Sequence, residues 1–236
     1  ITPTTPHCVT KSPSSANTIY YKQNHNITVL HTLFVKIIYF RIKHKINFSS
    51  VLRFFAVVSY HSAFEYYGYA NQVFYEVQVT SATRFRTFSY DGITYRHIGQ
   101  RIQGGVSELP GGIRVTTLER TVIDSINLFE KTGGLEELLR CLALIPALDE
   151  SELTACLSEY DSGILYQKTG YILSHFTGVL GLSEAFFENC SAHIPKGKNY
   201  LYENGQGFVW HEKWKLYAPA DLMQLINKGV NDYDAI

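Results

Sequence analysis

The chain has 236 residues, with 21 Lys and Arg, 21 Asp and Glu, and a formal net charge of zero at pH 7. That neutrality is the sum of two unlike parts, because residues 1–64 carry seven Lys and Arg but no Asp, Glu or Gly, and the remainder carries all 21 acidic residues. The acidic balance of the remainder argues against a protein that coats nucleic acid without regard to sequence. The four cysteines show no paired spacing, and Cys141 and Cys156 lie in helix-patterned stretches that are typical of buried thiols, which indicates a reducing compartment and hence a cytoplasmic protein.

The first part of the chain lacks the residues that compact domains use for turns and helix starts. Gly is the usual residue for turns at positive φ, and Asp is a common helix cap. We therefore expect residues 1–57 to be an irregular, atypical segment and 58–236 to be one folded domain. Every codon for the missing residue types begins with guanine, so our leading interpretation is upstream or frame-shifted translation joined to a genuine domain.

Two other interpretations of the leading segment remain open. The apolar run 27–42 resembles a targeting or membrane element, but it is shorter than a bilayer span and is interrupted by His31 and Lys36. The seven cations could instead form a basic nucleic-acid arm, although they make no dense tract. We expect no membrane partner.

The domain opens with a mixture of helix and strand signals. Residues 58–67 predict a short helix with Ser59 as its cap, ended by Gly68. Runs rich in Val, Phe, Tyr and Thr then predict strands, with a two-residue hairpin at Asp91-Gly92. We expect these strands to form an antiparallel meander, followed by a turn-forming loop. The strands are 73–80, 84–90 and 93–98, and the loop is 104–112.

The middle of the domain predicts helices and its end predicts sheet. A short strand at 113–115 leads into a helix at 117–130, where Thr116 and Glu119 have capping-box spacing before an apolar series. The series is Leu118, Val122, Ile126 and Phe129. Later helices are expected at 135–144, at 150–160 behind Asp149, at 163–176, and at 184–189 behind Ser183. Strands at 200–202, 208–210 and 214–217 and a helix from Pro219 to about 228 complete an α+β fold with a mostly antiparallel sheet and packed helices.

Common catalytic and cofactor motifs are missing from the sequence. It has no phosphate-binding loop, dinucleotide fingerprint, zincin motif, hydrolase elbow or zinc ribbon, so we expect no cofactor and no metal. Cys190 and His193 form a single C-x-x-H pair, which is two ligands short of a zinc site. We interpret them as unrelated residues in a loop.

A charged cluster on the helix 117–130 is the first candidate functional site. Arg120 and Asp124 are one turn apart on the face opposite the apolar series, with Glu119 beside them. The cluster could contact a nucleotide or a partner. It could equally be an ion pair on a solvated face, or Asp124 could turn inward and cap a neighbouring backbone segment.

Two further groups of residues were weighed as sites. Arg84 and Arg86 would share one face of a strand, with Arg96, His97 and Arg101 across the hairpin, and such a face could hold phosphates or could only aid solubility. His61 lies near Tyr60, Glu65 and Tyr66, where packing is a commoner role for histidine than catalysis.

Six ordered blocks resemble the C-terminal domain of the AbiEi family antitoxins, which belong to bacterial abortive-infection type IV toxin-antitoxin systems. RVTxxERTxxD within the third block is the most distinctive. The resemblance covers essentially residues 58–236. The blocks are VSYHSAFEYYGYANQ (58–72), FSYDGITY (88–95), IRVTTLERTVID (113–124), GGLEELLRCL (133–142), LYQKTGY (165–171) and WKLYAPADL (214–222).

The resemblance implies a bacterial antitoxin and transcriptional regulator. Family members have an N-terminal winged helix that represses their own operon and a C-terminal domain that counters a nucleotidyltransferase toxin without a stable complex. In this chain the segment without Gly and acids occupies the place of the winged helix and shows no helix-turn-helix pattern, so we expect operon DNA as a partner only if a winged helix is present. The leading hypothesis is a non-enzymatic antitoxin fragment.

Two alternative functions remain. The chain could be an enzyme that reverses toxin action on nucleotide or RNA, using Arg120, Asp124 and the Arg84 and Arg86 face. It could also be a protein-interaction module.

Overall fold

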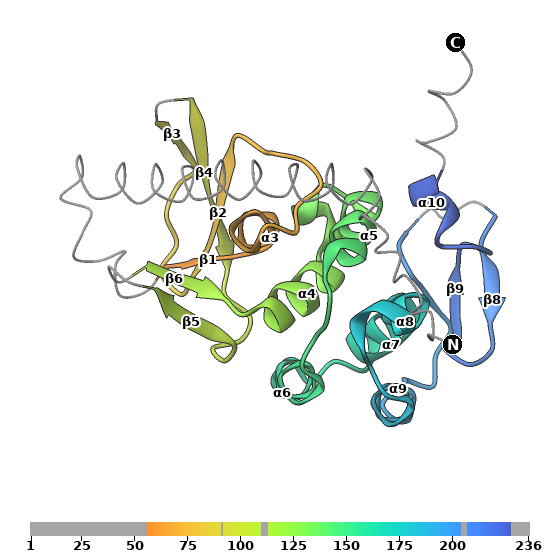
Figure 1. The fold of residues 1–236 in the computed structure, drawn as a ribbon. Coiled ribbons are helices and arrows are strands. Elements are labelled where there is room, and N and C mark those ends of the chain that lie inside the picture. Colours follow the sequence, from red (N-terminus) through yellow and green to blue (C-terminus); the bar gives the residue numbers. More distant parts are fainter. Residues whose placement is uncertain (1–55, 91, 110–112, 204–206, 228–236) are drawn as a thin grey trace, which may run out of the picture. The chain divides into compact units, whose positions relative to one another are not determined.

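The computed structural model describes residues 56–90, 92–109, 113–203 and 207–227 (Figure 1). Their helices and strands make an α+β fold, as the sequence predicts. No helix in these ranges combines the length and apolar composition needed to cross a bilayer. Nearly all of the segment 1–57, including the apolar run 27–42 and the position of a winged helix, lies outside the described residues.

The larger sheet has six strands in the order β3-β4-β2-β1-β6-β5. Strand β1 pairs antiparallel with β2 but parallel with β6, and β2 pairs parallel with β4, so the sheet is mixed. The predicted antiparallel meander is therefore wrong. The strands are β1 (Val57–Val58), β2 (Glu76–Ser81), β3 (Phe88–Tyr90), β4 (Ile93–Gly99), β5 (Val106–Leu109) and β6 (Ile113–Thr116).

The loop between β2 and β3 explains the mixed topology. Strand β3 begins at Phe88 rather than at Arg84, which leaves residues 82–87 as a loop that carries the chain past one strand position. The hairpin then returns β4 into that position, beside β2 and parallel to it. The hairpin itself is confirmed, because Tyr90 pairs with Ile93 and Gly92 has a left-handed φ of 78°.

The start of the domain differs from the predicted helix. Residues 57 and 58 form β1, and α3 (His61–Tyr67) begins only after Tyr60, which has a φ of 53°. Ser59 is not a helix cap, because its hydroxyl pairs with that of Thr80 at 2.6 Å and so joins β1 to β2. Gly68 ends the helix in the left-handed conformation, as predicted.

Two further predictions around the first long helix need correction. The loop predicted at 104–112 contains β5, which pairs with β6. The cap of α4 (Leu118–Asn127) is Thr117 rather than Thr116, and its hydroxyl accepts from the Arg120 amide at 3.3 Å. Thr116 is the last residue of β6. Helix α4 ends before the short 3-10 turn η2 (Phe129–Thr132), whose Phe129 completes the buried apolar series.

Most later helices follow their local signals. Helices α5 (Leu135–Leu144) and α6 (Glu150–Tyr160) have the predicted bounds, and Asp149 caps α6 by accepting from the Ser151 and Glu152 amides. Ser183 caps α9 as predicted. The predicted helix 163–176 is α7 (Gly163–Leu173) followed by the 3-10 turn η3 (Ser174–Phe176). The remaining helices are α8 (Thr177–Leu180), α9 (Glu184–Ala192) and α10 (Gln224–Asn227).

A smaller sheet follows α9. Its strands have the order β7-β9-β8, with β7 parallel and β8 antiparallel to the central β9. They are β7 (Asn199–Tyr200), β8 (Val209–His211) and β9 (Leu216–Ala218). The last helix begins at Gln224 rather than at Pro219, because the Pro219 carbonyl accepts hydrogen bonds from Tyr171 and His211 and is held at the end of this sheet.

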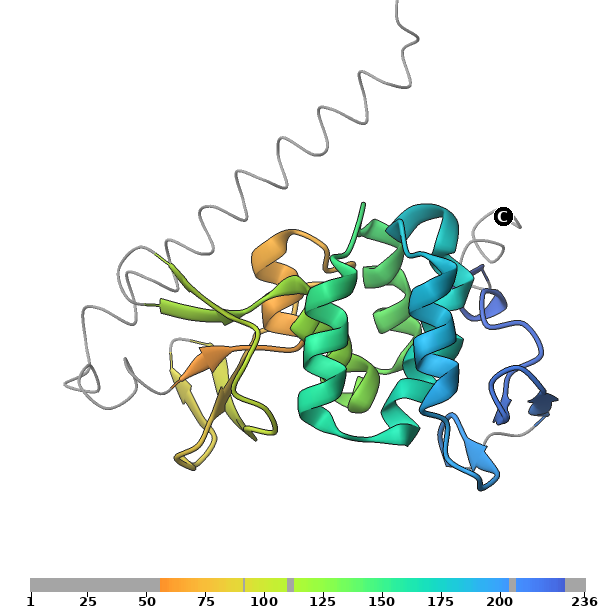
Figure 2. The same ribbon diagram turned by 90° about the horizontal axis from the view of Figure 1, so that it is seen from below.

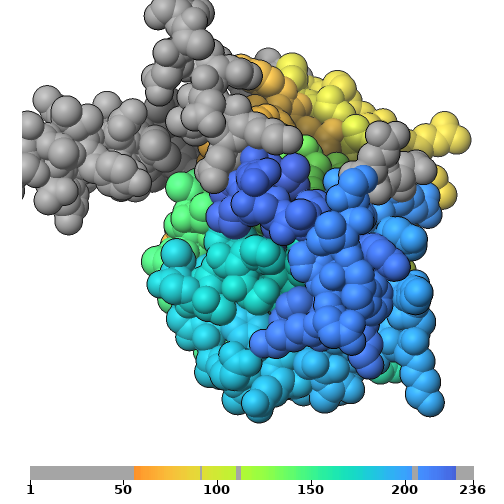
Figure 3. Space-filling model, turned by 90° about the vertical axis from the view of Figure 1, so that its right-hand side faces the viewer, coloured from red at the N-terminus to blue at the C-terminus, as the bar shows by residue number. Residues whose placement is uncertain are grey.

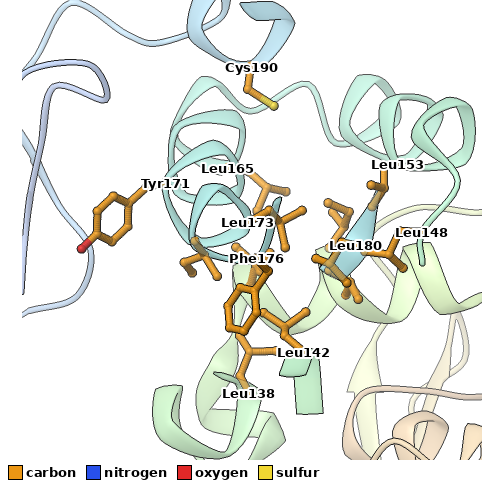
Figure 4. Packing of buried hydrophobic residues seen from close by; sticks show 14 of the residues in the cluster. Leu138, Leu142, Leu148, Leu153, Leu165, Tyr171, Leu173, Phe176, Leu180 and Cys190 are labelled. Atoms are coloured by element: carbon orange, nitrogen blue, oxygen red, sulfur yellow. The ribbon is translucent and has the colours of Figure 1, made fainter. Parts of the chain in front are cut away.

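Helices α4 to α9 form a layer between the two sheets (Figures 1 and 2). Helix α4 contacts α3, α6 and α7, and α7 contacts α9, so one apolar core runs through the helical layer. Figure 4 shows part of this core, where Phe176 lies close to Leu138 and Leu142 of α5. Cys141 and Cys156 are free thiols within the core, as the sequence predicts, and Cys190 is a third buried thiol that was not predicted.

Candidate functional site

The predicted charged cluster on α4 is buried rather than solvated. The exposed fractions of Arg120 and Asp124 are 0% and 2%, so the prediction that they face solvent is wrong. They form the predicted ion pair, with Arg120 Nε 3.3 Å from Asp124 Oδ2. The Arg120 guanidinium also donates to the Gly104 carbonyl, and the Tyr160 hydroxyl donates to Asp124 Oδ1. The pair therefore joins α4 to α6 and to the loop before β5.

The close fit of this cluster leaves no room for a ligand beside Arg120. Gly105 has a φ of 59°, and a Cβ at that position would lie 2.8 Å from Arg120 Cβ. The Gly105 carbonyl accepts from the Thr117 amide at 2.8 Å. Burial raises the pKa of the Asp124 carboxyl, and the Arg120 charge and the Tyr160 hydroxyl offset this only in part. The cluster is best explained as a structural contact.

The other predicted site residues do not join this cluster. Glu119 is half-buried and accepts from the Asp149 amide at 3.1 Å, which ties α4 to the start of α6. Arg84 and Arg86 are exposed in the loop 82–87, not on a strand, and this loop leads to the edge strand β3. Arg96 is paired with Glu76 at 2.8 Å. The predicted phosphate-holding strand face is therefore not formed.

A second buried polar network surrounds His61, which is fully buried. Its Nε2 lies 3.2 Å from Glu137 Oε1 and its Nδ1 lies 3.1 Å from Glu65 Oε1. Burial alone would lower the pKa of His61, but its interactions with Glu137 and Glu65 outweigh burial and raise the pKa. Burial alone would raise the pKa of Glu137, but hydrogen bonds from His61, Asn71 and the Gln72 amide outweigh it and lower the pKa. His61 thus has a packing role, as the sequence suggested.

His61, Glu137 and Cys141 carry potential metal ligand atoms within 4.8 Å of one another. Glu137 Oε1, however, already accepts from the Asn71 and Gln72 amides and from the Cys141 thiol. Burial raises the pKa of the Cys141 thiol, so the thiolate that a metal needs is disfavoured. The three residues fit a closed hydrogen-bonding network better than a metal centre. Cys190 is buried, whereas His193 is exposed and stacks on Tyr166, so the C-x-x-H pair forms no site.

Sequence reasoning missed Glu137, whose only signal is its i,i+4 spacing from Cys141 on α5. It also missed a pocket of about 540 Å³ at the start of β2, which residues of η2 line on one side. Phe74 lines this pocket and stacks on His61 at 3.9 Å, so it forms the wall in front of the buried network. Lys131 contributes a cation, and the exposed Tyr75 lies at the rim. The lining residues are Val73, Phe74, Tyr75, Glu76, Gln78, Thr94, Arg96, Glu130, Lys131 and Gly133.

The blocks that carry the family resemblance contact one another through buried polar groups. Glu137 in block 133–142 binds His61, Asn71 and Gln72 in block 58–72. Gln167 in block 165–171 donates to the carbonyls of Trp214 and Lys215 in block 214–222, at 2.8 Å each. These residues hold the blocks together within the fold.

Comparison with known proteins gives a likeness of fold. No family model matches the chain, and no curated protein matches it. Among solved structures, the chain is similar to the RV2827C protein from Mycobacterium tuberculosis, with a TM-score of 0.53 and 14% sequence identity. The match covers 75% of this chain and 66% of that protein. At this identity the likeness shows the fold alone.

Proposed function

We propose that this chain is an antitoxin of the AbiEi type, which acts in the bacterial cytoplasm and counteracts a nucleotidyltransferase toxin. One observation supports the proposal most directly. Four of the six blocks that resemble the family pack in pairs, through Glu137 and through Gln167, within one folded unit. These blocks are therefore parts of one folded unit, as a resemblance to a single domain requires.

The proposal gives the chain a non-enzymatic role. An enzyme that acts on nucleotide or RNA would rely on the Arg84 and Arg86 face together with two further residues, Arg120 and Asp124. Both are closed to solvent and satisfied by protein partners, so a substrate has no path to them. This observation weighs against that pair as catalytic groups.

The pocket beside Phe74 is the accessible region that we assign to antitoxicity. It places one cation, Lys131, and one ion pair, Arg96 with Glu76, beside the exposed Val73 and Tyr75, whose exposed fractions are 70% and 79%. A concave surface with a few charges and an apolar rim suits contact with a toxin or with its nucleotide substrate. The same rim would also serve a protein-interaction module.

Co-expression with the toxin gene encoded beside this one tests the proposal. The full chain is expected to restore growth of a bacterial host that expresses the toxin, and Tyr75→Ala and Lys131→Glu are expected to reduce rescue without lowering the melting temperature. Ile164→Ala, a change at an apolar side chain that is 45% exposed on α7, is the matched control and should rescue fully. Failure of the unaltered chain to rescue, at equal toxin level, would reject the proposal.

The fate of the buried pair separates the enzyme from the antitoxin. Arg120→Ala is expected to abolish rescue only together with loss of folded protein, measured by circular dichroism. Loss of rescue by a folded Arg120→Ala protein, or nucleotide turnover by the purified chain, would instead favour the enzyme.

A further inference from the structure

The smaller sheet carries a row of three aromatic rings, one from each strand. Tyr217 of the central β9 is in register with Tyr200 of β7 and with Trp210 of β8. The ring centroids of Tyr200 and Tyr217 lie 4.9 Å apart with the planes at 17°, and those of Trp210 and Tyr217 lie 5.0 Å apart. We call these three residues the aromatic row.

The row lies on the open face of the sheet. Leu216 and Ala218, the neighbours of Tyr217 along β9, are fully buried, and successive strand residues point to opposite faces. Tyr200 is 55% exposed, and Trp210 and Tyr217 are partly exposed. Figure 3 views the molecule from the side of this sheet, where residues 199–203 and 207–218 (blue) form a large part of the surface.

The row is held rigidly from behind. Gln167 of α7 donates to the carbonyls of Trp214 and Lys215 and accepts from Asn199 at 3.0 Å, so one buried side chain fixes β7 and the turn before β9. The indole of Trp210 donates to Glu212 at 2.6 Å, which sets the orientation of that ring. Aromatic rings held in place before binding lose little entropy when a flat ligand stacks on them.

Exposed lysines lie close to the row in the sequence. Lys198 precedes β7 and Lys215 precedes β9, so they come just before the paired Tyr200 and Tyr217, and both lysines are exposed. Between residues 196 and 217 there are four lysines against two glutamates, and one lysine, Lys213, is engaged by Glu184. This stretch is therefore basic, in a domain whose overall balance is acidic.

We propose that this face binds single-stranded nucleic acid, with bases stacked on Tyr200, Tyr217 and Trp210 and phosphates contacted by Lys196, Lys198 and Lys215. Aromatic rings spaced across a sheet and bordered by cations are what recognition of unpaired bases requires. The exposed lysines distinguish this face from the core of a stable protein interface, where lysine is depleted. The inference goes beyond the antitoxin proposal and does not rest on it.

Fluorescence anisotropy with the full chain and labelled 12-nucleotide probes tests the inference. Single-stranded RNA and single-stranded DNA of one sequence distinguish the two sources of ligand, and a duplex of that sequence should bind more weakly. Tyr200→Ala is expected to weaken single-strand binding roughly 5-fold to 150-fold, the range for loss of one stacked base. Tyr200→Phe keeps the ring and should bind like the unaltered chain. Lys198→Ala should weaken binding and reduce its salt dependence.

Several outcomes would overturn the inference. One is no binding of either single strand at about 50 mM salt, where phosphate contacts are strong. Another is binding that Tyr200→Ala leaves unchanged but Arg86→Ala abolishes, which would move the nucleic-acid contact to the loop 82–87. A third is a toxin complex that depends on Tyr200 in a chain that binds no nucleic acid, which would reassign the face to a protein partner. Growth rescue is a separate assay, so failure here leaves the antitoxin proposal standing.

Discussion

Replacing Arg120 with Ala should be among the most destabilising single changes in this domain. The substitution leaves the Asp124 carboxylate buried without its cation and the Gly104 carbonyl without its donor. Breaking a buried ion pair from one side costs about 3–5 kcal/mol, out of a total stability of about 5–15 kcal/mol for a typical domain. Because 1 kcal/mol shifts the melting temperature of a domain of this size by about 2–4 °C, we expect a fall of roughly 6–20 °C.

The chain contains a matched control for this prediction. Arg140 and Glu136 form another i,i+4 ion pair, on α5, at 2.7 Å, but their side chains are 24% and 58% exposed. Arg140→Ala removes the same kind of contact from a solvent-exposed site and should lower the free energy of unfolding by at most about 0.5 kcal/mol. Urea denaturation of both variants measures the difference. Equal costs for the two substitutions would refute the argument that burial makes the α4 pair essential.

The pH dependence of the same variant gives a second check. Burial already raises the pKa of Asp124, and removal of Arg120 takes away the nearest charge that opposes this rise. A carboxyl whose folded-state pKa exceeds its unfolded value binds more protons when folded, so stability falls as pH rises through that window. Arg120→Ala should therefore regain part of its lost stability as the pH is lowered towards the unfolded pKa of Asp124, and Asp124→Asn in the same background should remove that gain.

Three further predictions concern other buried groups. The folded-state pKa of His61 is raised, so its contribution to stability is complete below about pH 6.5 and is lost as pH rises through the folded-state pKa. Urea denaturation across that range should show that the free energy of unfolding declines more steeply for the unaltered chain than for His61→Asn. Gly170→Ala should lower the free energy of unfolding by about 1–3 kcal/mol, because the new Cβ would lie 2.1 Å from the Trp214 ring. Gly178→Ala, with open space around it, should be neutral or stabilising. Unfolding followed by tryptophan fluorescence compares the two variants. Burial raises the pKa of the Cys156 thiol to about 12, so peptide mass spectrometry should find it alkylated at about pH 8 only after unfolding, and rapid labelling of the native protein would contradict this.

The sequence predicted those parts of the fold that depend on local signals. Helix α6 begins and ends where expected because Asp149 caps it through amides only two and three residues away. The pairing of β2 with β4 was not predicted, because it depends on whether residues 82–87 form strand or loop, and Arg and Phe in that run are compatible with both. Strand propensity carries no information on which neighbour a strand selects.

The candidate site was mispredicted for a related reason. The apolar series of α4 correctly identified one buried face, and the opposite face was then assigned to solvent. In the structure the loop at Gly104 and helix α6 cover that opposite face, and Arg120 and Asp124 satisfy the polar groups that these elements bring with them. The spacing of apolar residues identifies the apolar face of a helix but does not show whether the polar face is also covered. A helix that is covered on both faces can bury charged side chains where they are paired.

The position of the family-like blocks bears on where function should be sought. Arg120, Glu137 and Gln167 belong to three different blocks, and each is a fully or nearly fully buried side chain that binds backbone groups of a distant segment. Selection for folding alone is enough to preserve such residues, because a buried polar group without its partner costs about 1–3 kcal/mol. A chain can therefore keep every block and still have lost its activity. The informative substitutions are the exposed ones, at the rim of the Phe74 pocket and along the aromatic row, where a change in function need not change the fold.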